Sequence, residues 1–94
     1  MQHFFTLGVQ EVHQVEIRFE RFFGKFEIRV DTWPAVSEHI LFGFELTRTW
    51  NIWVGIHEKH LLSVQKTRPA FAPAFRPHTW RIYVDNILVN QFDA

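Results

Sequence analysis

The densest group of metal-ligating and acid–base side chains in the sequence is the run His57-Glu58-Lys59-His60. A helical zinc motif places two histidines at positions i and i+4, with a third ligand farther along the chain. Here the two histidines stand at i and i+3, in a stretch that the flanking pattern predicts to be a hairpin turn. Two histidines are also an incomplete ligand set for zinc. We therefore interpret the run as a solvated turn, and we predict no metal site and no cofactor.

Nucleophilic catalysis needs a constellation that this sequence lacks. There is no cysteine, and neither of the two serines, Ser37 and Ser63, stands in a nucleophile elbow. Ser37 precedes Glu38 and His39, but successive side chains of a strand point to opposite faces. The three groups are therefore not expected to meet.

Paired carboxylates are the other route to acid–base chemistry. Glu16, Glu20 and Glu27 would share one face of a predicted hairpin, but three cations occupy the same face: Arg18, Lys25 and Arg29. Opposite charges across neighbouring strands usually form stabilising pairs. We predict that the protein is not an enzyme.

Cations and aromatic rings alternate in the segment 66–81. Three prolines within residues 68–77 exclude an inner strand and an ordinary helix. Two interpretations are open. The loop could fold its phenylalanines over an open end of a small core, or it could present a semi-rigid apolar surface to a protein partner. The partner-binding residues that we predict are Arg68, Phe71, Phe75 and Arg76.

The same segment supports an alternative function, the binding of an anion or a nucleic acid. Its residues would be Lys66, Arg76 and Arg81, with bases stacked on the neighbouring aromatic rings. Residues 59–94 hold five bases and two acids, although the whole chain has zero net charge. The zero net charge and the lack of a recognised RNA-binding motif argue against a nucleic-acid partner.

The elements that must position these residues are β-strands. In the stretch 13–31, apolar and charged residues alternate with period two on both sides of a short link ending at Gly24, which predicts an antiparallel hairpin. Similar alternation predicts strands at about 3–9, 39–47, 49–55, 60–66 and 80–84, with a last strand at 87–91 after a tight turn at Asp85-Asn86. Residues 31–34 are expected to form a turn, because Pro34 holds its predecessor extended.

We therefore predict one domain over residues 1–94, an all-β antiparallel β-sandwich of about seven or eight strands with no substantial helix. Eleven phenylalanines and four tryptophans can fill such a core with few residues. The predicted core comprises Val15, Ile17, Phe19, Phe26, Ile28, Val30, Phe42, Phe44, Trp50, Ile52, Leu62, Val64, Trp80, Ile82 and Val84.

Location and assembly follow from composition. The first residues carry neither a basic segment nor a long apolar run, so we expect no signal peptide. No run approaches the ~18 apolar residues of a membrane span, and we expect a cytoplasmic protein. An exposed edge strand could pair with a second copy of the chain to form a homodimer.

Several short motifs, taken in order, resemble the Fas apoptotic inhibitory molecule family. They are Val12-His13 before the strand Val15–Phe19, the turn at Gly24-Lys25, Val30-Asp31, Phe44-Glu45-Leu46, Val54-Gly55 and Tyr83-Val84-Asp85-Asn86. Animal members resemble two tandem β-sandwich units, and this chain has the length of one; Thr32 stands where the family pattern has glycine. The resemblance implies an antiparallel sandwich and a non-catalytic protein-interaction role, regulatory or protective against aggregation.

Overall fold

The computed structural model describes residues 1–40, 46–71 and 76–94. The described residues form eight β-strands and no helix. The strands are β1 (Gln2–Leu7), β2 (His13–Glu20), β3 (Lys25–Val30), β4 (Trp33–His39), β5 (Thr47–Val54), β6 (His60–Thr67), β7 (Thr79–Val84) and β8 (Ile87–Asp93). Within these ranges there is accordingly no helix long and apolar enough to cross a membrane.

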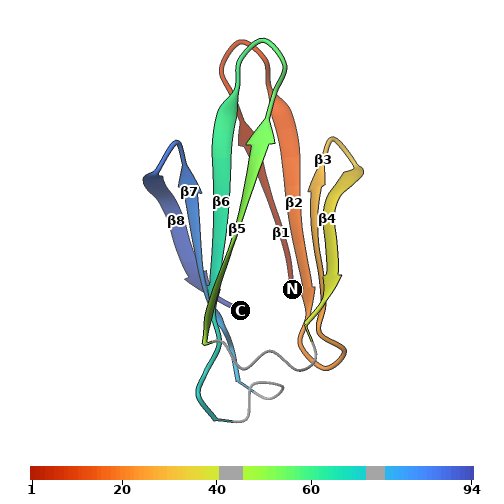
Figure 1. Cartoon of the computed structure of the whole chain (residues 1–94), viewed down its shortest axis with the longest axis vertical. Helices are drawn as coiled ribbons and strands as arrows, with labels where there is room; N and C mark the ends of the chain where they lie inside the picture. Colours follow the sequence, from red (N-terminus) through yellow and green to blue (C-terminus); the bar gives the residue numbers. More distant parts are fainter. Residues whose placement is uncertain (41–45, 72–75) are drawn as a thin grey trace.

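The strands form two four-stranded antiparallel sheets, each a simple meander. One sheet has the order β1-β2-β3-β4 and the other has the order β5-β6-β7-β8. Figure 1 shows the two sheets as two layers, with the β1–β2 and β5–β6 loops together at one end of the molecule. This architecture confirms the predicted all-β antiparallel sandwich.

The core lies between the sheets and is built from the alternating positions that the sequence predicts. Val15 and Ile17 of β2, and Leu62 and Val64 of β6, are completely buried. Phe26 stacks on Trp50 of the opposite sheet, with ring centroids 4.0 Å apart. Such aromatic contacts add directional attraction to the burial of apolar area, and this one joins the two layers at their centre.

The observed core differs from the predicted one at a few positions. Leu7 and Val54 are buried although the sequence analysis did not select them, and three predicted members are only half-buried. Those three are Val30, Ile52 and Val84. Phe42 and Phe44 lie outside the described residues.

One strand prediction was wrong. The fourth strand was placed at 39–47 after a turn at 31–34, whereas β4 spans Trp33–His39. The turn needs only Asp31 and Thr32, whose φ angles are +50° and +70°, as in the two-residue type I′ turns that match strand twist. Pro34 then fits inside β4 because that strand is an edge, where a missing N–H costs no ladder bond. Residues 41–45, which the predicted strand also included, lie outside the described residues.

The second sheet repeats the first. Each has a two-residue turn with positive φ between its last two strands, at Asp31-Thr32 and at Asp85-Asn86. Cross-strand pairs of β2–β3 and of β6–β7 correspond when they stand at equal distances along the chain from these turns and from the first residues of β2 and β6. The pairs Val15–Val30, Ile17–Ile28 and Phe19–Phe26 in one sheet match Leu62–Val84, Val64–Ile82 and Lys66–Trp80 in the other. The fold is thus built from two similar halves.

Candidate functional site

Three of the predicted partner-binding residues lie at the end of the molecule where β6 leads toward β7: Arg68, Phe71 and Arg76. The Arg68 backbone N–H donates to the carbonyl oxygen of Leu46 at 2.8 Å, which fixes the start of the connection. Phe71 is 75% exposed, and the guanidinium carbon of Arg76 lies 5.8 Å from its ring centroid. This is a cation–π distance, so the two predicted residues do meet. Phe75 lies outside the described residues.

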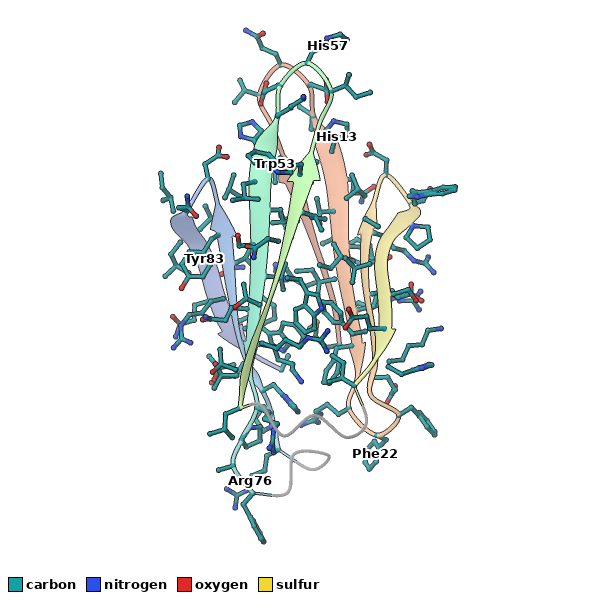
Figure 2. The ribbon with its side chains drawn as sticks, in the orientation of Figure 1. His13, Phe22, Trp53, His57, Arg76 and Tyr83 are labelled. Carbon is teal, nitrogen blue, oxygen red and sulfur yellow. The ribbon has the colours of Figure 1, made fainter. Side chains whose placement is uncertain are left out.

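Two further phenylalanines reach solvent at the same end. Phe22 and Phe23, in the turn between β2 and β3, are 60% and 72% exposed. The turn is closed by a hydrogen bond of 2.7 Å from the Gly24 N–H to the Glu20 carbonyl oxygen. Figure 2 shows Phe22 and Arg76 at the same end of the sandwich. We call Phe22, Phe23, Arg68, Phe71 and Arg76 the aromatic end.

The structure does not gather the predicted anion-binding set. Lys66 shares the inner face of β6 with Leu62 and Val64 and is 5% exposed. Arg81 lies on the outer face of β7, where its Nε donates to Gln91 at 3.3 Å. Lys66 and Arg81 are thus on opposite sides of one sheet, because odd and even positions of paired strands alternate.

Burial changes the chemistry of Lys66. Its Nζ lies 4.9 Å from the ring centroid of Phe19, in the facing sheet. Desolvation lowers the pKa of the Lys66 ammonium below its usual value, and the positive charges of Arg68 and Arg48 lower it further. The predicted anion-binding role of Lys66 did not take this burial into account.

The opposite end of the molecule holds a network that joins the two sheets. Glu11 accepts hydrogen bonds from the backbone N–H groups of Ile56 and His57, each at 2.8 Å. In return, Glu58 accepts hydrogen bonds from the backbone N–H groups of residues 9 and 10, each at 2.7 Å. Each loop therefore supplies the carboxylate that satisfies the other loop's backbone donors.

A histidine orients each of these carboxylates. His13 places Nε2 2.5 Å from Glu11 and Nδ1 2.5 Å from Asp31, so both ring nitrogens face carboxylate oxygens. Two acceptors favour the doubly protonated imidazolium, and the hydrogen bonds to Asp31 and then Glu11 raise the pKa of His13. The hydrogen bond from His13, with those from the facing loop, lowers the pKa of Glu11 to about 2.

The second half repeats this arrangement. His60 lies 2.6 Å from Glu58 and 2.7 Å from Asp85, and its pKa is raised for the same reasons. The pKa of Glu58 is lowered to about 2, first by its hydrogen bond with His60. We call the six side chains of both halves the carboxylate clasp: Glu11, His13, Asp31, Glu58, His60 and Asp85.

The carboxylate clasp revises the interpretation of residues 57–60. Glu58 accepts hydrogen bonds from the backbone of the facing loop, and His60 is hydrogen-bonded to Glu58 and Asp85 within its own half, so neither is simply solvated. Over residues 1–40, 46–71 and 76–94, no group of three or more His, Cys, Asp or Glu side chains is placed to hold a metal ion. The contacts of the carboxylate clasp are those of a structural fastening between two loops.

A sequence signal for the carboxylate clasp exists. The stretches Gly8–His13 and Gly55–His60 share Gly, a β-branched apolar residue, Glu and His at the same spacing, and a Val-Asp pair follows farther along the chain in each half. A search of the chain against itself would have found this repeat.

Comparison with protein-family models, with curated proteins and with solved structures returned no match. The resemblance to the Fas apoptotic inhibitory molecule family therefore rests on the short sequence motifs alone and stays a prediction.

Proposed function

We propose that the protein is a non-catalytic protein-interaction module whose partner binds at the aromatic end. The observation that carries this proposal is that the phenyl rings of Phe22, Phe23 and Phe71 are exposed in loops of both halves. Figure 2 shows Phe22 and Arg76, which contacts Phe71, at one end of the molecule. Exposed apolar groups that gather in one place commonly mark an interaction surface.

The chemistry of the aromatic end suits protein recognition. Burying one phenylalanine side chain against a partner contributes about 1.5–3 kcal/mol, so a few rings can supply most of a useful binding energy. Arginine beside an aromatic ring, as Arg76 lies beside Phe71, is a combination enriched among residues that dominate binding energy. A regulatory or aggregation-protective role, implied by the family resemblance, would use the same surface on folded or unfolding partners.

The decisive experiment replaces Phe71 with a photo-crosslinking phenylalanine analogue and compares it with the same analogue at Trp33. Trp33 is also 75% exposed but stands on β4, outside the aromatic end. We expect position 71 to crosslink a defined protein that position 33 does not. With that protein purified, Phe71→Ala should weaken the affinity at least about tenfold, and Trp33→Ala should leave it unchanged.

Two results would contradict this proposal. One is equal crosslinking from both positions. The other is unfolding of the Phe71→Ala variant, which would mean that the ring covers the core. An aggregation-protective role is checked separately, by whether the wild type suppresses light scattering of a heated client enzyme better than Phe71→Ala does.

The nucleic-acid alternative has one observation in its favour, the cation–π contact between the exposed Phe71 and Arg76. Phosphate contacts release counterions, so binding would weaken steeply with added salt. Absence of binding to single-stranded DNA or RNA at low salt would eliminate it. Edge-strand pairing with a second copy stays a prediction, checked by the mass in solution.

A further inference from the structure

The two halves of the fold differ sharply at one buried position. Phe19 in β2 and Lys66 in β6 occupy corresponding places, each six residues after a histidine of the carboxylate clasp. Their cross-strand partners are both aromatic, Phe26 and Trp80. One half therefore fills this place with a phenyl ring, and the other fills it with a lysine that is only 5% exposed. A packing role alone does not require a lysine here.

The surroundings of Lys66 carry positive charge. Arg48 of β5 lies directly across from it, and Arg68 follows it by two residues. Among the described side chains, no acid forms an ion pair with Lys66, and the charges that act on it most are those two arginines. A buried charge is usually paired, so an ammonium group among cations indicates a partner that is not part of the described chain.

A neighbouring contact shows which chemical group this face of the sheet accepts. Glu38 reaches across from β4 and takes hydrogen bonds from Arg48 at 2.6 Å and from the indole Nε1 of Trp50 at 3.2 Å. A cation and an indole N–H on this face thus hold one carboxylate.

Lys66 and Trp80 repeat the same pair of donor types. They are direct cross-strand neighbours, and both contact the ring of Phe19. The indole Nε1 of Trp80 is buried and has no hydrogen-bond acceptor within the described part of the chain. A lysine that is 5% exposed and a buried indole N–H therefore stand on neighbouring strands against the same phenyl ring.

We propose that the Lys66 ammonium and the Trp80 indole N–H form a binding site for a carboxylate group, next to the carboxylate of Glu38 that Arg48 and Trp50 already hold. The site is distinct from the aromatic end and does not rest on the proposed partner binding. The carboxylate belongs either to a free small acid or to an acidic side chain of a peptide. Binding pairs the buried charge and favours the protonated lysine.

The test follows the Lys66 side chain by NMR, using the ¹³Cε shift to titrate its amine with and without sodium acetate, against sodium chloride at equal ionic strength. We expect acetate to raise the Lys66 pKa by about one unit, as an opposite charge nearby does, and to raise the melting temperature. In the Lys66→Met variant the melting temperature should not respond to acetate. The exposed Lys59→Met variant is the matched control and should respond as the wild type does.

A short blocked peptide with two glutamates distinguishes the sources of the carboxylate. Saturable shifts at Lys66 and Trp80 Nε1 with acetate assign the site to small acids, and shifts with the peptide alone assign it to an acidic segment. No shift with either would overturn the proposal, as would an acetate effect that persists in Lys66→Met.

A Glu45→Gln variant adds a check, because Glu45 adjoins Leu46 in sequence. If that change alone lowered the Lys66 pKa without acetate, the chain's own acid would be the partner and the proposal would fail.

Discussion

The turns Asp31-Thr32 and Asp85-Asn86 correspond in the two halves, so the second residue of each turn can be replaced by the residue type found in the other. Thr32 and Asn86 occupy the second position of each turn, with φ angles of +70° and +66°. Both side chains are exposed. Asparagine tolerates this left-handed conformation well, whereas a β-branched residue rarely adopts it. We therefore expect Thr32→Asn to stabilise the domain and Asn86→Thr to destabilise it.

The size of the effect follows from the backbone. The left-handed conformation costs an ordinary L-residue roughly 1–2 kcal/mol, and asparagine avoids much of this cost. We expect each exchange to change the free energy of unfolding by about 1 kcal/mol, in opposite directions. For a domain of this size, about 1 kcal/mol corresponds to a shift in melting temperature of roughly 4–8 °C.

Urea denaturation and thermal melting of the two variants measure the exchange. Thr32→Val is the control, since it keeps the β-branch and removes only the hydroxyl, and it should give no gain. If Thr32→Asn were neutral or destabilising while Asn86→Thr lost stability, the strain would not reside at Thr32. A gain from Thr32→Val equal to that from Thr32→Asn would also refute the reasoning, because the backbone conformation would not then be the cause.

Two further predictions concern the carboxylate clasp. The raised pKa values of His13 and His60 mean that their stabilising contribution is complete below their usual pKa of 6.5 and is lost as pH rises through the folded-state values. The pKa values of Glu11 and Glu58 are lowered to about 2. The stabilising contribution of these two carboxylates is therefore complete above pH 4.5, their usual pKa, and is lost as the pH falls toward 2. Melting temperature against pH should therefore peak in mildly acidic buffer, and a His13→Gln/His60→Gln variant should lose the alkaline decline. Gly55→Ala should lower the free energy of unfolding, measured by urea denaturation, by more than about 1 kcal/mol. The reason is that Gly55 has φ +106° and that a Cβ there would lie 1.9 Å from the Glu58 carbonyl oxygen. An equal loss of stability in Gln10→Ala would contradict this prediction.

Local patterns were enough to predict most of the fold. The alternation in the 13–31 hairpin places Val15, Ile17 and Phe26 in the core because a half-buried sheet needs period two. The Asp85-Asn86 turn was also predicted correctly, since both residues accept positive φ. The strand β4 was misplaced because the turn was predicted to extend through Pro34, whereas Asp31 and Thr32 alone complete it and Pro34 lies in the strand.

The candidate sites depended on contacts that local patterns do not encode. The carboxylate clasp joins residues of two loops that are distant in sequence, and only their shared pattern could have paired them. The sequence indicated only a hairpin link at Phe22 and Phe23, and their place at the same end of the molecule as Arg76 follows from the arrangement of the two sheets. Lys66 was assigned to an anion-binding set with Arg76 and Arg81, although its alternation with Leu62 and Val64 already placed it on the inner face.

Comparison of the two halves separates residues that serve folding from those that do not. The glycine, glutamate and histidine of the loops are the same in both halves, and they fasten the sheets to each other. Phe19 and Lys66 differ at a corresponding buried place, where an aromatic side chain would pack without a desolvated charge. Replacing a buried ionic group by an apolar one of similar volume is often neutral or stabilising. A Lys66→Met variant that folds and melts higher than the wild type would show that this lysine is retained at a cost to stability, as expected of a residue that binds a ligand.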